Sequence, residues 1–300
     1  MLHTKLPAIN DTEDACVPAG LPPVIDSHVH VFPEAVFAAV WQWFEQHGWS
    51  IRYQLSTEQV FDFLLSRGIS HIVALQYAHK PGIASELNRY MADKCGLYPN
   101  RVTGLATVYP GEDAAGRILQ EAFDAGLGGL KLHAHVQCFD MNAEYMNPLY
   151  ECCRKNQKPL VVHAGREPKS PAYPCDPHEL CRADKLERVL RDFPDLRICV
   201  PHLGFDELRA YRDLTEKTDN LWLDTAMVLA DYFPGQESID LRDYRIDRVM
   251  YGTDFPNIPY AWDREIKRLQ AADLSRDRLE RLFTKNAADF FAITGSDQHI

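Results

Sequence analysis

Long hydrophobic runs are missing from this sequence: no apolar stretch approaches the roughly 20 residues that span a bilayer. Residues 1–22 include Asp11, Glu13, Asp14 and Pro18 but no apolar signal core. We therefore expect no membrane partner, and we predict that the protein works in the cytoplasm.

Paired cysteines and basic clusters are missing as well. None of the eight cysteines forms a CxxC pair, and their spread along a long chain predicts reduced thiols rather than a disulfide framework. The 43 acidic residues outnumber the 32 basic ones, the net charge is −11, and no Lys/Arg block could follow a phosphate backbone. Nucleic acid is therefore not an expected partner.

The sequence does contain a repeated alternation of strands and helices. Of its 300 residues, 46% are apolar and 25% are charged, so the chain can bury a large core. Short apolar runs predict eight strands, at residues 24–30, 71–77, 102–109, 127–133, 159–163, 196–202, 220–225 and 248–254. Segments with helical spacing separate them, for example after Ser56 and Gln59, which fit a capping box.

Eight such units in one chain predict the fold class. Near-continuous apolar strands joined by helical crossovers imply a parallel sheet that is covered on its outer face. We expect an α/β protein, a single-domain (β/α)8 TIM barrel over residues 23–300, preceded by an N-terminal tail at 1–22.

Two connections, 31–56 and 164–182, are longer than a strand-to-helix loop needs to be. The first is rich in aromatic residues and the second in prolines. Because both follow strands, both should stand over the C-terminal mouth of a barrel, where active sites lie. We predict that they form walls of the site; the aromatic residues could also pack a helix onto the barrel, and the two interpretations are compatible.

Histidines collect at the ends of the predicted strands. The residues concerned are His28, His30, His133, His163 and His202, joined by Asp254. In a barrel the strand ends share one mouth, so residues distant in sequence converge there. Because side chains on a strand repeat every two residues, His28 and His30 point in one direction.

Imidazole and carboxylate groups are the ligands that suit Zn²⁺ and similar divalent ions. An ion with open coordination positions lowers the pKa of a bound water to about 7. The cluster therefore predicts a divalent metal ion and metal-assisted hydrolysis. Zinc is the first choice of ion, and manganese and iron are the alternatives.

The same residues lie in short motifs that resemble the amidohydrolase superfamily. The resemblance is to its amidohydrolase-related (type 2) branch, which includes aminocarboxymuconate-semialdehyde decarboxylase and its relatives. The motifs are residues 25–30 (IDSHVH), 129–133 (GLKLH), 161–165 (VVHAG), 201–204 (PHLG) and 251–256 (YGTDFP). Their order and spacing cover most of the chain and imply a metal-dependent enzyme on a (β/α)8 barrel.

The resemblance also implies roles for individual residues. The ligands of a single metal would be His28, His30, His163 and Asp254. His202 matches a histidine that ligates a second metal or serves in acid/base catalysis.

Lys131 needs a separate interpretation. It matches the strand-four lysine that bridges two metals, when carboxylated, in some members of the superfamily. It could equally be a barrel-core lysine paired with a carboxylate. A second site for metal or substrate, formed by Lys131, His133 and His202, is thus the alternative to a single-metal centre.

The leading hypothesis is a metal-dependent hydrolase that acts on a small, carboxylated or cyclic amide, ester or lactone. Asp254 or His202 would take the proton of the attacking water, and His202 would protonate the leaving group. Arg166, just past His163, could bind a substrate carboxylate or form a salt bridge that ties down its loop.

Two other functions stay open. A nonoxidative decarboxylase of an aromatic or unsaturated carboxylic acid follows from the same resemblance, because decarboxylases of this branch use a nearly identical ligand set. A barrel without chemistry, serving as a binding or scaffold protein, is the third hypothesis. For the enzyme the expected partner is a small-molecule substrate, and a homo-oligomer is compatible with the sequence.

Overall fold

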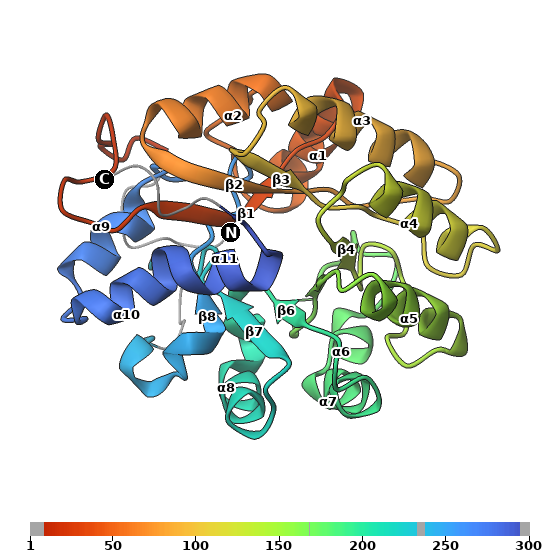
Figure 1. Cartoon of the computed structure of the whole chain (residues 1–300). Coiled ribbons are helices and arrows are strands. Elements are labelled where there is room, and N and C mark those ends of the chain that lie inside the picture. Colours follow the sequence, from red (N-terminus) through yellow and green to blue (C-terminus); the bar gives the residue numbers. More distant parts are fainter. Residues whose placement is uncertain (1–8, 168, 233–237, 295–300) are drawn as a thin grey trace.

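Eight short parallel strands form the centre of the molecule, and helices surround them (Figure 1). The computed structural model describes residues 9–167, 169–232 and 238–294. The strands are β1 Val24–His30, β2 Ile69–Leu75, β3 Val102–Gly104, β4 Leu130–His133, β5 Leu160–His163, β6 Ile198–Val200, β7 Leu221–Asp224 and β8 Val249–Met250. They form two sheets, in the orders β1-β2-β3 and β4-β5-β6-β7-β8.

Isolated parallel bridges join the two sheets into a ring. Ala106, just past β3, pairs with Leu130 of β4, and Val29 of β1 pairs with Phe255, just past β8. At the second seam the backbone N–H of His30 donates to the carbonyl oxygen of Phe255 at 2.7 Å. The (β/α)8 barrel predicted from the sequence is therefore confirmed. At each of the two seams a single bridge pairs the neighbouring segments, in place of the longer ladders within the sheets.

The outer layer consists of helices that follow most of the strands. They are α1 Glu34–His47, α2 Thr57–Ser66, α3 Ala84–Gly96, α4 Ala115–Asp124, α5 Asn147–Lys155, α6 Pro177–Leu180, α7 Ala183–Asp192, α8 Leu208–Lys217, α9 Arg264–Ala271, α10 Arg276–Glu280 and α11 Asn286–Phe291. The predicted capping box of Ser56 and Gln59 is confirmed at the start of α2. In the part of the chain that the structure describes, no helix has the length and apolarity needed to cross a membrane.

Several strands end earlier than the sequence predicts, among them β3, β6 and β8. β6 stops at Val200 because Pro201 has no N–H to donate to the ladder, and His202 turns the chain away with a φ of 57°. β3 continues past Gly104 only as the bridge at Ala106, and β8 has two residues. His202 and Asp254 therefore lie in turns beyond the strand ends rather than in the ladders themselves.

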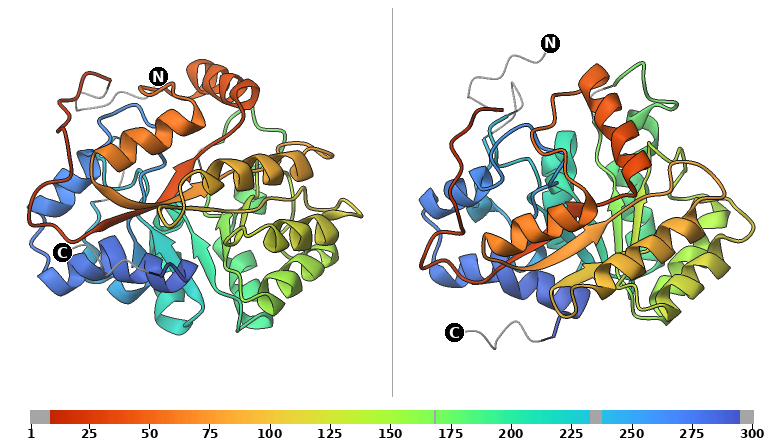
Figure 2. Two further views of the ribbon diagram at one scale, coloured as in Figure 1. Left: turned by 45° about the horizontal axis from the view of Figure 1, so that its top comes forward. Right: turned by 90° about the horizontal axis from the view of Figure 1, so that it is seen from above.

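The apolar core has two layers. Inward-facing side chains of the strands fill the barrel together with Phe290 and Phe291, and they include Ile25, Val73, Leu105, Val161, Cys199 and Met250. A larger cluster lies between the strands and the outer helices. Helix α11 covers one end of the barrel, while α1 and the connection after β5 stand at the opposite end (Figure 2). The mouth of the barrel therefore faces α1.

Residues 9–22 lie against the segment that follows β8. Asp11 forms an ion pair with Arg264 at 2.7 Å, and the indole N–H of Trp262 donates to the carbonyl oxygen of Asp14 at 3.2 Å. The division of the chain at residue 22 stays a prediction.

Candidate metal centre

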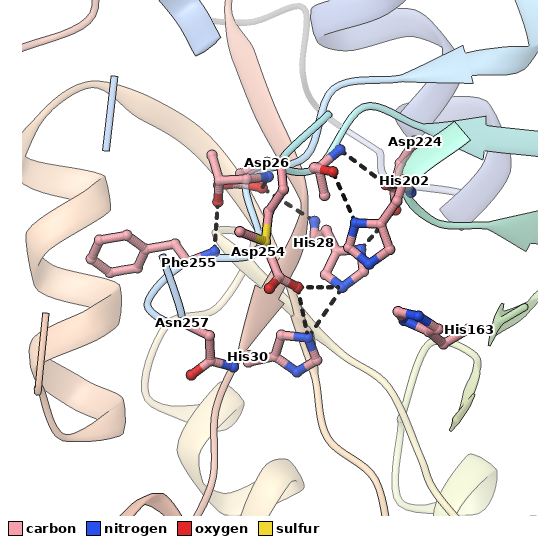
Figure 3. Close-up of polar contacts among 12 residues, drawn as sticks. Asp26, His28, His30, His163, His202, Asp224, Asp254, Phe255 and Asn257 are labelled. Atoms are coloured by element: carbon pink, nitrogen blue, oxygen red, sulfur yellow. Dashed lines mark hydrogen bonds and ion pairs between the residues drawn. The ribbon is translucent and has the colours of Figure 1, made fainter. Parts of the chain in front are cut away.

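His28, His30 and Asp254 form a compact group at the mouth of the barrel (Figure 3). Both histidines end β1, and the strand period of two places them on the same face. The Nε2 atoms of His28 and His30 lie 3.1 Å apart. Asp254 Oδ1 lies 3.1 Å from His28 Nε2 and 3.0 Å from His30 Nε2. Three donor atoms thus converge on one point.

Asp224, the last residue of β7, sets the orientation of His28. Its Oδ2 accepts a hydrogen bond from His28 Nδ1 at 2.7 Å, which leaves the lone pair on Nε2. Its Oδ1 accepts the backbone N–H groups of His202 and Ala226 at 2.9 and 3.1 Å. A carboxylate behind a ligating imidazole is a common way to fix the tautomer of that ligand.

Burial and charge act against each other in this group. Burial by itself would raise the pKa of Asp254, but His30 and His28 hold it well below its usual value. Burial lowers the pKa of His30 to about 4 despite the neighbouring Asp254. For His28 burial is the largest effect and lowers the pKa, but the charge and hydrogen bond of Asp224 together with the hydrogen bond of Asp254 outweigh it, so that the pKa is raised. A carboxylate beside a neutral imidazole is the form in which both can bind a cation.

His202 lies beside this group in the turn after β6. Its ring centroid is 5.3 Å from that of His28 and 4.8 Å from that of His163. Nδ1 donates to the carbonyl oxygen of Ala226 at 2.8 Å, so Nε2 keeps its lone pair. Burial lowers the pKa of His202 to about 4 and keeps the ring neutral at pH 7. The residue can therefore accept a proton.

A second group of imidazoles lies on the β4 and β5 side of the mouth. One ring nitrogen from each of His133, His135 and His163 lies within 4.8 Å of the others. The rings of His133 and His163 are stacked, with centroids 4.0 Å apart and planes 9° apart. His163 Nε2 contacts Oε1 of Glu167, and His135 Nε2 lies 3.4 Å from Oε2 of the same carboxylate.

The sequence predicts His163 as a ligand in the same group as His28, His30 and Asp254. The structure brings it to the same mouth, beside His202, but its Nε2 is bonded to Glu167. Its role as a ligand stays a prediction.

Lys131 is buried beneath the mouth on β4. Its Nζ has no hydrogen-bond partner among the described residues. Burial lowers the pKa of the amine to about 8, while Asp224 and Asp254 act in the opposite direction. Both interpretations of Lys131, a carboxylated bridge and a core lysine, stay open.

The mouth opens into a cavity of about 1120 Å³. As predicted, both long connections form its walls: Trp43 and Phe44 of α1 line one side, and Tyr173 and Pro174 line another. The rings of Trp43 and Tyr173 stack with centroids 5.5 Å apart, which closes part of the cavity. His30, His202 and Asp254 lie at its inner end.

Arg166 also lines the cavity, but its guanidinium has a protein partner. Its Nε lies 3.3 Å from Oε1 of Glu207, and 42% of its side chain is exposed. The carboxylate of Glu207 also accepts the backbone N–H of Arg166 at 3.2 Å. This arrangement favours the salt bridge that ties down the loop, and it leaves the rest of the guanidinium available to a substrate.

Comparison with known proteins agrees with this geometry. The family model Amidohydro_2, described as Amidohydrolase, matches residues 25–293. The chain belongs to this amidohydrolase family. The resemblance inferred from the sequence, and with it the prediction of an enzyme, is confirmed. No curated protein matches the chain.

Solved structures share the amidohydrolase fold. A TIM-barrel protein from Bordetella bronchiseptica is 20% identical with a TM-score of 0.71, over 90% of this chain and 98% of that chain. A 5-carboxyvanillate decarboxylase from Novosphingobium aromaticivorans, complexed with manganese, is 18% identical with a TM-score of 0.65, over 94% and 99%. A probable 2-pyrone-4,6-dicarboxylic acid hydrolase from Acinetobacter baumannii is 16% identical with a TM-score of 0.63, over 90% and 99%. At these identities the likeness concerns the fold.

Three further residues lie at the mouth of this amidohydrolase, and the sequence assigns a role to none of them. Asp224 ends a predicted strand, so the rule that found the histidines also predicts that Asp224 faces the mouth, but it does not predict the hydrogen bond to His28. His135 follows His133 by two residues and faces the same way. Glu167 follows His163 by four residues, but in a loop this spacing does not predict that the two side chains are in contact.

Proposed function

We propose that this protein is a metal-dependent hydrolase whose ion is held by His28, His30 and Asp254. The observation that carries the proposal is the convergence of three donor atoms at 3.0–3.1 Å while Asp224 keeps a proton on His28 Nδ1. Two ligands at right angles on one ion, with bonds of about 2.1 Å, lie about 3 Å apart. The donor set therefore fits a divalent ion. Zinc is our first choice, with manganese and iron as alternatives.

His163 is the fourth ligand that the sequence predicts, and it would have to exchange Glu167 for the ion. A second ion bridged by a carboxylated Lys131 remains the alternative to this single-metal centre.

An ion bound here would act as a Lewis acid and lower the pKa of a coordinated water to about 7. Residues of the chain would then accept and donate the protons of the reaction. His202 Nε2 carries a lone pair and can accept the proton of the attacking water, because Nδ1 is committed to Ala226. The same nitrogen can return that proton to the leaving group. Asp254 is the second candidate base.

The cavity suggests the class of substrate. Aromatic side chains of Trp43, Tyr77 and Tyr173 line it and offer flat apolar surfaces. Arg166 lines the same cavity and its side chain is 42% exposed, which suits a carboxylate. A small, carboxylated or cyclic amide, ester or lactone matches both features.

Decarboxylation is the second candidate function. The aromatic walls also suit a benzoate-like acid, and the structural neighbours include decarboxylases of 5-carboxyvanillate and 2,6-dihydroxybenzoate. In that reaction His202 Nε2 would first take a proton from a water in the cavity and then pass it to the carbon that loses CO2.

One assay separates these functions. The chelator-treated protein, reloaded with Zn²⁺ or Mn²⁺, is tested on a panel of lactones, esters, amides and aromatic acids, with hydrolysis and CO2 release followed in parallel. We expect ion-dependent hydrolysis that disappears in His30→Ala. CO2 release with no hydrolysis would favour the decarboxylase. No turnover, with metal content below about 0.2 equivalents after growth in supplemented medium, would favour a binding or scaffold protein.

The proposal includes a cytoplasmic location and a small-molecule substrate as the only partner needed for activity. A homo-oligomer stays compatible with it.

A further inference from the structure

His133, His135 and Glu167 form a second donor set that the proposed reaction does not use. All three side chains line the cavity on the side of β4 and β5. His133 and His135 come from the end of β4 and the residues just past it, and Glu167 comes from the connection after β5. Two imidazoles and one carboxylate are a known ligand set for zinc and for other divalent transition metals.

The spacing of His135 and Glu167 fits an ion better than it fits a hydrogen bond. His135 Nε2 and Glu167 Oε2 lie 3.4 Å apart. That separation is long for a charge-assisted hydrogen bond, which is usually about 2.7–2.9 Å. Two ligands of one tetrahedral ion, with bonds of about 2.0–2.1 Å, lie about 3.3–3.4 Å apart.

Each imidazole is prepared for this role. His135 Nδ1 lies 3.7 Å from the thiol of buried Cys181, and this contact faces away from Glu167 and leaves Nε2 for a ligand. His133 has a buried Nδ1 without a hydrogen-bond partner among the described residues. The planes of the two rings are 89° apart, so lone pairs in those planes can meet at one point.

A ring nitrogen of His163 also lies within 4.8 Å of those of His133 and His135, but His163 is the less suitable third donor. Its plane is nearly parallel to that of His133, with centroids 4.0 Å apart, so their lone pairs run side by side rather than converge. Its Nε2 is already bonded to Oε1 of Glu167. The oxygen that faces His135 is the other one, Oε2, which leaves a carboxylate oxygen for an ion.

We propose that His133, His135 and Glu167 bind a second divalent cation, distinct from the ion at His28, His30 and Asp254. The open coordination positions of that cation would face the cavity. Tyr173, whose hydroxyl donates to Glu167 Oε2 at 3.4 Å and whose ring stacks on Trp43, would then connect the cation to the cavity wall. Binding would therefore fasten the connection after β5 to the end of β4.

Metal stoichiometry tests this proposal without an activity assay. The chelator-treated full chain is titrated with Mn²⁺ by calorimetry, and bound metal is counted by mass spectrometry after dialysis. We expect two equivalents in the wild type, one in His135→Ala and one in His28→Ala. In Glu167→Gln we expect one equivalent to weaken by more than about tenfold, because the anionic ligand is lost. His79→Ala, which removes a cavity histidine outside both groups, should keep two.

The outcomes separate this site from the proposed function. A wild type that binds one equivalent, and loses it in His28→Ala but not in His135→Ala or Glu167→Gln, would overturn the second site and leave the first. Two equivalents retained in both His135→Ala and Glu167→Gln would also overturn it. One equivalent lost in His135→Ala and kept in His28→Ala would uphold the second site and overturn the first. Because His135 is buried, circular dichroism must show that its variant is folded, and the partly exposed Glu167 provides the second variant.

Discussion

The two donor groups at the mouth differ in what holds them. His28 and His30 end a seven-residue strand, and Asp224 fixes the proton of His28 from the end of β7. The carboxylates of both groups lie past a strand end, but the backbone N–H of Asp254 donates to the carbonyl oxygen of His28 at 2.9 Å, which ties Asp254 to β1. Glu167 lies in the long connection after β5 and reaches His135 at 3.4 Å, whereas Asp254 reaches its two histidines at 3.0–3.1 Å. Donors on buried strands keep their positions better than donors on loops. We therefore expect the first group to be preorganised and the second to be ordered by its ion.

Asp254→Asn should have the largest effect, because Oδ1 contacts both histidines of the first group. We expect the first ion to be lost and turnover to fall by at least about 10⁴-fold, since a ligand and a candidate base are removed together. Metal content and kcat are the measurements. Asp206→Asn, at another cavity aspartate, is the matched control. An Asp254 variant that keeps its ion and a tenth of its activity would contradict this assignment.

His202→Ala sharpens the comparison because His202 lies between His28 of the first group and His163, and belongs to neither donor group. Turnover should fall by about 10² to 10⁴-fold, the usual contribution of a positioned acid or base. The ion at His28 should stay, as mass spectrometry of the dialysed protein can show. Full activity on a confirmed substrate would make His202 structural and leave Asp254 as the base. Loss of one ion of two would instead favour the bridge through Lys131.

Asp224→Asn tests the hydrogen bond that fixes the tautomer of His28 in the first group. The histidines of the second group have no such carboxylate behind them among the contacts described above. Without the carboxylate the tautomer of His28 is no longer fixed, and affinity for the first ion should fall by about 10–100-fold. Activity should return at high metal concentration, which a metal titration of kcat would measure. Cys181→Ala, at the corresponding position behind His135, should leave the first ion unchanged. If Cys181→Ala lowered the affinity for the first ion as much as Asp224→Asn does, the two groups would not differ in how their histidines are held.

The pH dependence should show the smallest effect. Burial holds the pKa of His202 at about 4, so this base is already deprotonated at pH 6 and its titration lies below that range. A rise in rate between about pH 6 and 8 should therefore come from the water that loses its proton, and not from His202. His202→Ala should be slower but keep the same rise. A wild-type rate that is flat over this range, with chemistry limiting, would count against the mechanism.

The strands and the first group could be predicted because they obey periodic rules. Alternation along β1 places His28 and His30 on one face, and parallel strands in a barrel bring Asp254 to them. The lengths of the strands were less predictable. Pro201 ends the pairing of β6 at Val200, and the chain after Met250 no longer pairs with β7 as a strand.

The partners of the loop residues could not be predicted. Glu167 lies in a connection with no periodicity, so its contact with His163 depends on a backbone path that the sequence does not encode locally. The preference of Arg166 for Glu207 is of the same kind, because Glu207 belongs to a different connection.

Anomalous diffraction from crystals grown with Mn²⁺ tests the central claim most directly. We predict a peak about 2.0–2.3 Å from His28 Nε2, His30 Nε2 and Asp254 Oδ1, with a weaker second peak between His133, His135 and Glu167. A saturated crystal with no peak at the first group would contradict the account, whether or not the second group is filled.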